Sequence, residues 1–132
     1  MNIIHRWLCR SAYWRRAVEQ SLLPWALEGI DLGSDVLEIG PGPGLTTDWL
    51  RQRVTHLTAL EIDPRLAGAL KQRLRGTNVR VIEDDATKMP FEDRSFSAVI
   101  SLTMLHHVPS SALQDKLLAE ARRVLRHGGV FV

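Results

Sequence analysis

The chain has 132 residues, 45% of them hydrophobic and 24% charged, which is the size and composition of one globular domain. Its formal net charge of +2 is too small to indicate a nucleic-acid-binding protein. No apolar run reaches the roughly 18 residues of a membrane-spanning helix. The single cysteine, Cys9, excludes an internal disulfide and suits a reducing, cytoplasmic location.

The first 29 residues predict an N-terminal amphipathic helical cap. Apolar residues recur at helical spacing over residues 3–28, and Pro24 is expected to open a new turn or to kink the run. Arginines at positions 6, 10, 15 and 16 interrupt any apolar segment, so the N-terminus does not resemble a signal peptide. This basic face is either simply solvated or contacts an anionic partner, such as a membrane surface.

From residue 30 to residue 132, short apolar strands alternate with helices. Strands are predicted at 36–39, 57–62, 79–83, 96–102 and from 130 onward, and helices at 45–53, 64–75 and 110–126. Asp63 is expected to cap the helix that starts at Pro64, and Ser110 or Ser111 the last helix. Continuous apolar strands that alternate with helices indicate an α/β fold, with a Rossmann-like, doubly wound, mostly parallel sheet between two layers of helices.

The stretch 40-GPGPG-44 lies where the first strand is expected to meet the following helix. Ligands bind beyond the carboxyl ends of strands in such sheets, and glycine lets a ligand approach the backbone closely. The spacing G-x-G-x-G, followed by Leu45, departs from the G-x-G-x-x-G fingerprint of dinucleotide-binding proteins. Glu38 places a carboxylate near this turn, where it would repel a phosphate but suit a cationic ligand.

Two further acids follow the next two strands. Glu61 lies near the end of the second strand, where an acid can accept hydrogen bonds from both hydroxyls of a ribose. Asp85 follows the third strand, where it can accept from an exocyclic amine such as that of adenine. Together these acids indicate a nucleoside with a positively charged tail.

Five stretches resemble, in order, the motifs of class I S-adenosylmethionine-dependent methyltransferases. They are 36-VLEIGPGPG-44, 60-LEIDP-64, 83-EDDATKMPF-91, 96-FSAVISLTMLHHV-108 and 120-EARRVLRHGGVFV-132. The resemblance covers about residues 30–132 and implies that the chain binds S-adenosylmethionine. The residues that it places at the cofactor are Glu38, Gly40, Gly42, Gly44, Glu61, Ile62, Asp85, Ala86, Leu102 and Thr103.

The resemblance also implies a role for each of these residues. The three glycines would line the methionine part of the cofactor, and Glu38 would help to hold its ammonium end. Glu61 would bind the ribose, with Ile62 packed on the adenine. Asp85 would accept from the adenine amine beside Ala86. Leu102 and Thr103 would approach the sulfonium and the acceptor.

Methyl transfer from a sulfonium mainly requires alignment and a dry pocket. His106 and His107 follow the fourth strand, and either is a weak candidate for a general base, whereas a purely structural role is the favoured interpretation. The 60-LEIDP-64 motif is also similar to that of ribosomal RNA adenine dimethylases. However, 101-SLTM-104 departs from their Asn-x-Pro-aromatic motif, which favours a small-molecule acceptor. No metal is expected.

The family's sheet has seven strands, whereas this sequence ends three residues into the expected fifth strand. Strands 6 and 7 are therefore expected to be absent, and a partner or a second copy of the chain could cover the exposed edge. Two alternatives remain open. One is a fragment that binds the cofactor but is inactive, and the other is a nucleotide-dependent oxidoreductase, which the glycine spacing disfavours.

Overall fold

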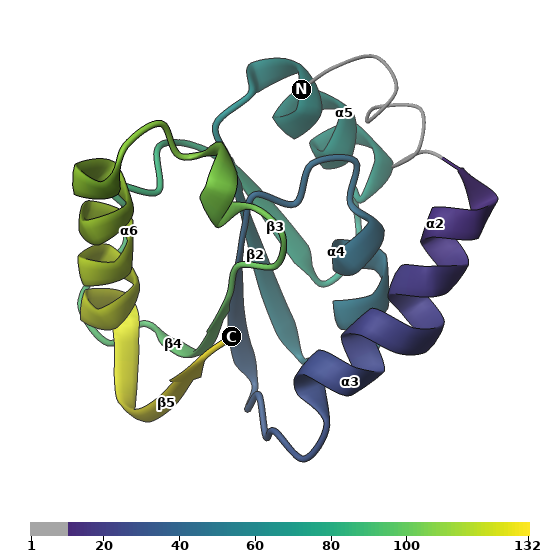
Figure 1. Cartoon of the computed structure of the whole chain (residues 1–132), viewed down its shortest axis with the longest axis horizontal. Coiled ribbons are helices and arrows are strands. Elements are labelled where there is room, and N and C mark those ends of the chain that lie inside the picture. The colour runs from purple at the N-terminus through teal and green to yellow at the C-terminus, as the bar shows by residue number, and fades with distance from the viewer. Residues whose placement is uncertain (1–10) are drawn as a thin grey trace. The chain divides into compact units, whose positions relative to one another are not determined.

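The computed structural model describes residues 11–132, so the part of the predicted N-terminal helix at residues 3–10 lies outside the described residues. The chain divides into two compact units, Met1–Ile30 and Asp31–Val132. Figure 1 shows the elements of each unit, which are described separately below. No helix in the described part is long and apolar enough to cross a membrane.

The described part of the first unit is helical, as the apolar spacing predicted. It consists of α2 (Ala12–Ala17), the π-helical turn η1 (Val18–Leu22) and α3 (Leu23–Leu27). The Ser11 hydroxyl caps α2 by accepting a hydrogen bond from the Trp14 amide at 3.1 Å. Pro24 lies at the start of α3, directly after the π-helical turn, and Leu22 and Leu23 keep right-handed helical angles, so the helical run changes type before the proline and continues through it.

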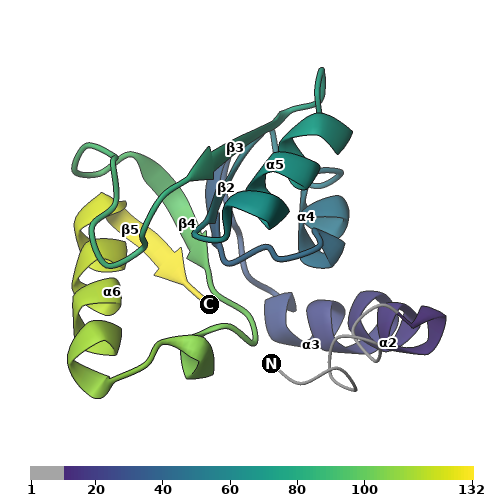
Figure 2. The ribbon, with the colours of Figure 1, turned by 90° about the horizontal axis from the view of Figure 1, so that it is seen from above.

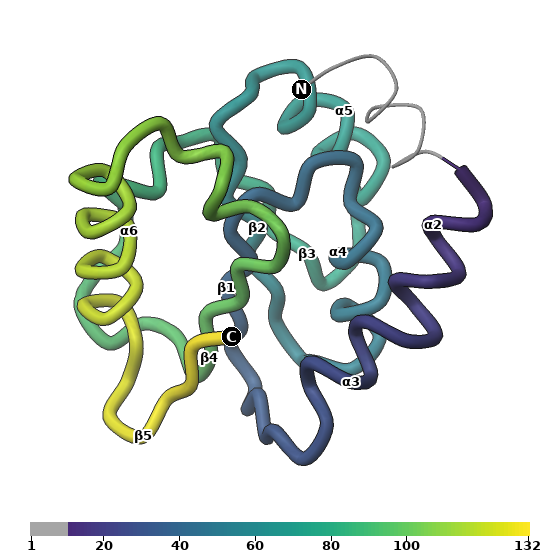
Figure 3. Tube along the Cα trace, viewed as in Figure 1, coloured from purple at the N-terminus to yellow at the C-terminus, as the bar shows by residue number. Residues whose placement is uncertain are grey.

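The second unit is built on a five-stranded sheet in which every pair of neighbouring strands is parallel. The strands are β1 (Asp35–Ile39), β2 (His56–Glu61), β3 (Val79–Glu83), β4 (Phe96–Ile100) and β5 (Leu125–Phe131), in the order β3-β2-β1-β4-β5. The chain moves outward from β1 to β3 and then returns to the other side of β1, as Figure 3 shows. The strand order therefore reverses between β1 and β4, which is where ligands bind in open parallel sheets.

Helices cover both faces of this sheet. They are α4 (Leu45–Leu50), α5 (Pro64–Arg73), the 3₁₀ turn η2 (Leu105–His107) and α6 (Ser111–Val124). Leu60 belongs to a core cluster with α6, and its neighbour Ala59 belongs to a second cluster with α5. Since successive strand residues point to opposite faces, α6 and α5 cover opposite sides of the sheet, as Figure 2 shows. The predicted doubly wound fold is therefore confirmed.

The helix caps also follow the sequence. Asp63 Oδ1 accepts hydrogen bonds from the amides of Arg65, at 2.8 Å, and Leu66, at 3.3 Å, at the start of α5. Ser110 Oγ accepts from the Leu113 amide at 3.3 Å at the start of α6. Both contacts satisfy amides that lack a partner in the first turn of a helix.

Four predicted boundaries were wrong by two residues or more. The expected helix 45–53 ends at Leu50, where the Asn78 amide group donates to the carbonyls of Arg51 and Val54 at 2.8 and 2.9 Å and so closes the chain into a turn. The helix predicted to end at residue 75 ends at Arg73, and the fourth strand ends at Ile100, each two residues earlier than expected. The fourth error concerns the junction of α6 and β5.

The sequence predicted a helix to residue 126, a glycine turn at 127–129 and a strand from residue 130. Instead α6 ends at Val124 and β5 begins at Leu125, which pairs with Phe96. The ladder is then interrupted until Val130 pairs with Ala98, and Gly128, with φ of +75°, lies within the interruption. Pairing with β4 therefore places the glycine residues in an irregularity of the strand. Residues 11–132 form five strands, with no sixth or seventh among them.

Candidate functional site

The glycine loop connects β1 to α4 at the carboxyl edge of the sheet. Gly40, Gly42 and Gly44 all have positive φ values, of +70°, +55° and +88°, which side chains other than glycine rarely adopt. The Gly40 amide donates to the Leu60 carbonyl and the Gly44 amide to the Pro41 carbonyl, both at 2.9 Å. The loop is therefore tied to β2 at its start and to itself at its end.

The three glycines differ in what surrounds them. A Cβ at Gly40 would collide with the side chain of Met104, and a Cβ at Gly44 would collide with Leu70 and Arg73. A Cβ at Gly42 would meet no atom within 4 Å. The first and third glycines thus make room for side chains of the protein, whereas the middle one faces open space that a ligand can enter.

Glu61, at the end of β2, is joined to this middle glycine. Its side chain is only 5% exposed. Oε2 accepts a hydrogen bond from the Gly42 amide and Oε1 from the Asp63 amide, both at 3.0 Å. These bonds offset the cost of burying a carboxylate, and each oxygen retains a second lone pair that can accept from a ligand hydroxyl. The structure therefore brings two of the predicted site residues together.

The other predicted residues near the ends of β2 and β3 lie on the surface. Ile62 is 67% exposed, which is unusual for a large apolar side chain beside a buried acid. Asp85 is exposed, and its Oδ1 accepts from the amide and the hydroxyl of Thr87, both at 2.8 Å. Ala86 packs on the edge of the core cluster that contains α6. The backbone bond from the Asp84 amide to the Glu61 carbonyl, at 3.1 Å, holds this turn beside the end of β2.

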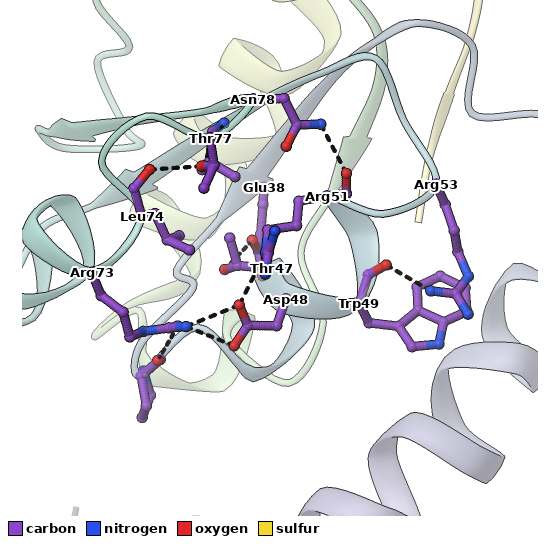
Figure 4. A network of polar contacts seen from close by, with 12 residues as sticks. Glu38, Thr47, Asp48, Trp49, Arg51, Arg53, Arg73, Leu74, Thr77 and Asn78 are labelled. Atoms are coloured by element: carbon purple, nitrogen blue, oxygen red, sulfur yellow. Dashed lines mark hydrogen bonds and ion pairs between the residues drawn. The ribbon is translucent and has the colours of Figure 1, made fainter.

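Glu38 lies inside the protein, between β1 and α4, and is only 3% exposed. Its Oε2 accepts a short hydrogen bond, 2.6 Å, from the buried hydroxyl of Thr47 (Figure 4). The pKa of Glu38 is raised to about 7, chiefly because burial disfavours the charged form; the Thr47 bond opposes this rise, and the nearby charges of Asp48 and Glu61 add to it. The carboxyl group is therefore poised to ionise when a cation approaches it near neutral pH.

A polar network supports the glycine loop from the α5 side. The Arg73 guanidinium donates to both carboxylate oxygens of Asp48 at 2.9 Å and to the Pro43 carbonyl at 3.2 Å (Figure 4). Asp48 also accepts from Arg51 at 3.3 Å. The predictions did not include Thr47, Asp48 or Arg73, and no local pattern marks them, because the contact from Arg73 to Asp48 spans 25 residues.

The segment after β4 carries the remaining predicted residues. Leu102 is half-buried and Thr103 is exposed, with a left-handed backbone at φ of +57°. His106 and His107 are exposed in η2, and their rings lie 4.0 Å apart between centroids, tilted by 41°. Within the described part of the chain, no group of three or more His, Cys, Asp or Glu side chains could hold a metal ion.

The loop between β3 and β4, which carries Asp85, is anchored to α6 by Arg123. This guanidinium donates to the carbonyls of Phe91, at 2.7 Å, and Met89, at 3.1 Å. It also pairs with Glu120 at 2.7 Å, and Glu120 Oε2 accepts from the Met89 amide at 2.7 Å. The bond from Arg123 lowers the pKa of Glu120, so both groups stay charged near neutral pH.

Comparison with known proteins identifies relatives of this site and fold. The model of a family described as a methyltransferase domain matches residues 37–132. A demethylmenaquinone methyltransferase of Tropheryma whipplei is 32% identical over 126 residues, which are 93% of this chain and 48% of the relative. A probable ribosomal RNA small subunit methyltransferase A of Thermococcus onnurineus is 39% identical over 84 residues, which are 64% of this chain and 29% of the relative.

The fold also matches solved structures. The crystal structure of the PH0226 protein of Pyrococcus horikoshii superposes with a TM-score of 0.79 at 26% identity, covering 92% of this chain and 57% of that one. The chain spans about half the length, or less, of the two curated relatives.

Proposed function

This chain belongs to the methyltransferase-domain family of class I S-adenosylmethionine-dependent methyltransferases, and we propose that it binds S-adenosylmethionine and directs its methyl group to a small-molecule acceptor. One observation carries the proposal. The buried carboxylate of Glu61 is held by the amides of Gly42 and Asp63 at 3.0 Å, at the point where the glycine loop opens to solvent. A carboxylate held in this way can accept hydrogen bonds from the two hydroxyls of a ribose.

The residues around Glu61 fit the rest of this cofactor. Ile62 offers an exposed apolar surface for an adenine ring. Asp85 would accept a hydrogen bond from the exocyclic amine of that ring, and Ala86 would lie beside it. Gly42 leaves the backbone open beside the methionine part, between Gly40 and Gly44. Glu38 supplies a carboxylate beneath the loop that would favour the cofactor's ammonium group.

Bound S-adenosylmethionine would supply a methyl group on an activated sulfonium leaving group. The residues of the chain would then align the acceptor and exclude water. Leu102 and Thr103 are the proposed neighbours of the reacting atoms. His106 or His107 would accept a proton if the acceptor must lose one, since histidine titrates near neutral pH.

A small acceptor is supported by three observations. The side chains of Leu102, Met104, Leu105 and Val108 are half-buried and apolar, and 101-SLTM-104 lacks the Asn-x-Pro-aromatic pattern of base-modifying relatives. The demethylmenaquinone methyltransferase aligns with 93% of the chain. The second candidate is methylation of an RNA adenine, which the 39% identity to the Thermococcus protein favours. Transfer of a labelled methyl group to ribosomal RNA, but not to quinol-like small molecules, would select this second candidate.

The test of cofactor binding is calorimetric titration with S-adenosylhomocysteine. We expect the wild-type chain to bind and Glu61→Ala to lose binding. Glu92→Ala, which removes an exposed carboxylate from the β3–β4 loop, should bind like wild type. Circular dichroism would show that each variant is folded, and Glu61→Gln would separate loss of charge from loss of volume. A folded wild-type chain that does not bind would refute cofactor binding and leave an inactive fragment as the alternative.

We further propose two partners and a location. Phe131 and Leu118 are 42% and 39% exposed, which supports a second copy of the chain at β5. Tyr13 and Trp25, 80% and 76% exposed, and the nearby arginines support weak contact of the first unit with an anionic membrane surface. Sedimentation velocity and co-sedimentation with anionic vesicles test these two contacts. The single cysteine supports a cytoplasmic location.

A further inference from the structure

Met104 contacts the glycine loop at its first glycine. A Cβ on residue 40 would collide with the Cγ of Met104, and the Cβ and Cε of Met104 lie 3.2 and 3.4 Å from the position of that Cβ. Any side chain at residue 40 would therefore have to displace Met104. No local sequence pattern marks this methionine, because its contact with Gly40 joins residues 64 positions apart.

The loop is held from both faces of the sheet. Met104 packs against the core cluster that contains α6, whereas Leu70, which lies against Gly44, belongs to the cluster that contains α5. The middle glycine, Gly42, has no neighbour on its open side. Two side chains from opposite faces thus fix the ends of the loop and leave its centre free.

The backbone before Met104 is strained in a way that serves this contact. Thr103 has φ of +57°, and a β-branched residue rarely adopts such a conformation unless its surroundings enforce it. The Met104 carbonyl then accepts a hydrogen bond from the His107 amide at 2.8 Å, which closes η2. Met104 therefore joins the glycine loop to the turn that carries both candidate histidines.

We propose that Met104 is a positioning residue, whose side chain fixes the glycine loop relative to the end of β4 and so sets where the methyl-bearing end of the cofactor lies. This inference rests on the proposed function, because it assumes that the loop holds S-adenosylmethionine. Met104 acts through Gly40 and η2 and takes no part in the reaction itself. Removal of the Met104 side chain leaves a gap that lets the glycine loop shift. Small shifts of groups in a binding site can have large effects on ligand affinity and on the reaction rate.

The first test compares Met104→Ala with Met104→Leu. We expect Met104→Ala to bind S-adenosylhomocysteine about tenfold more weakly than wild type, or worse. Met104→Leu retains a carbon at the γ position and should restore affinity to within about threefold. Lys116→Ala, which truncates a long exposed side chain on α6, is the control and should bind like wild type. Affinity of Met104→Ala equal to that of wild type would overturn the proposal.

A spectroscopic readout separates positioning from general stability. The chain has three methionines, Met1, Met89 and Met104, so ¹³C-methyl methionine spectra are simple to assign with Met104→Leu. The Met104 methyl signal should shift when S-adenosylhomocysteine is added. A signal that stays unchanged while the ligand binds would contradict a role beside the cofactor.

A third measurement needs no ligand, so its failure differs from failure of the proposed function. Gly40→Ala should lower the urea midpoint of unfolding less in the Met104→Ala background than in wild type, because the collision is then absent. If Gly40→Ala lowers the urea midpoint equally in both backgrounds, the Met104 side chain does not restrict residue 40. If wild type instead fails to bind S-adenosylhomocysteine while the two losses differ, the cofactor assignment is wrong and the contact stands.

Discussion

Glu38 is expected to make the stability of this protein fall as the pH rises towards neutral. Its pKa is 4.5 in the reference state and about 7 in the folded chain, where burial disfavours the charged form. One pKa unit corresponds to about 1.4 kcal/mol, so the ionised carboxyl group costs about 3 kcal/mol of folding free energy above pH 7. Glu38→Gln removes this cost while its amide oxygen can still accept from Thr47.

The sign follows from proton binding. Between pH 4.5 and about 7 the folded state keeps the Glu38 proton while the unfolded state has released it. The contribution of protonated Glu38 to stability is therefore fully present below pH 4.5, and it is lost as the pH rises through about 7. The stability advantage of Glu38→Gln over wild type should grow from near zero at pH 4.5 to about 3 kcal/mol at pH 8.

Urea denaturation of both proteins between pH 4.5 and 8 measures this difference directly. Glu92→Gln serves as a control, because it neutralises an exposed carboxylate and should show no such trend. A Glu38→Gln variant that is less stable than wild type at pH 8 would refute the reasoning. A difference that does not change with pH would refute it equally, because the effect would then arise from packing.

Three further predictions concern the same region. Affinity for S-adenosylhomocysteine should increase as the pH rises through about 7, because the ammonium group of the ligand favours the ionised form of Glu38. Below that pH, binding should release the Glu38 proton, and calorimetry in two buffers of different ionisation enthalpy should detect this release. Arg73→Ala should cost about 1 kcal/mol, since its ion pair with Asp48 is partly exposed, and should weaken ligand binding more than Arg65→Ala at an exposed position of the same helix. Arg123→Ala should cost about 2 kcal/mol and speed amide hydrogen exchange in residues 84–95, whereas unchanged exchange would show that the loop holds its own conformation.

Much of the fold was predictable because parallel strands that are buried on both faces have continuous apolar sequences. The bounds of β3 were predicted without error, and those of β1 and β2 to within one residue. The junction at Val124 and Leu125 was not predictable in this way. Leu125 satisfies the helical spacing equally well, and only its pairing with Phe96 across the sheet makes it the first residue of a strand.

The candidate site was predictable to a different extent. Acids that follow parallel strands gather at one edge of the sheet, so their positions alone predict that Glu61 and Asp85 lie at the edge where the cofactor is proposed to bind. The hydrogen-bond contacts around the site could not be predicted in this way. Glu61 bonds to Gly42, 19 residues away, and Arg73 bonds to Asp48, 25 residues away. Such contacts depend on how helices pack on the sheet, and spacing along the sequence does not contain that information.

The glycine loop shows why identical residues need separate explanations. All three glycines have positive φ, so backbone conformation alone would make them equivalent. Their surroundings distinguish them, because a Cβ at Gly40 would collide with Met104 and a Cβ at Gly44 with Leu70 and Arg73, whereas a Cβ at Gly42 would meet no atom within 4 Å. An alanine at Gly42 costs only the conformational strain, whereas at the other two positions a collision adds to it. A side chain at Gly42 would instead project into the open space where the cofactor is proposed to bind, so this substitution should impair ligand binding more than it impairs folding.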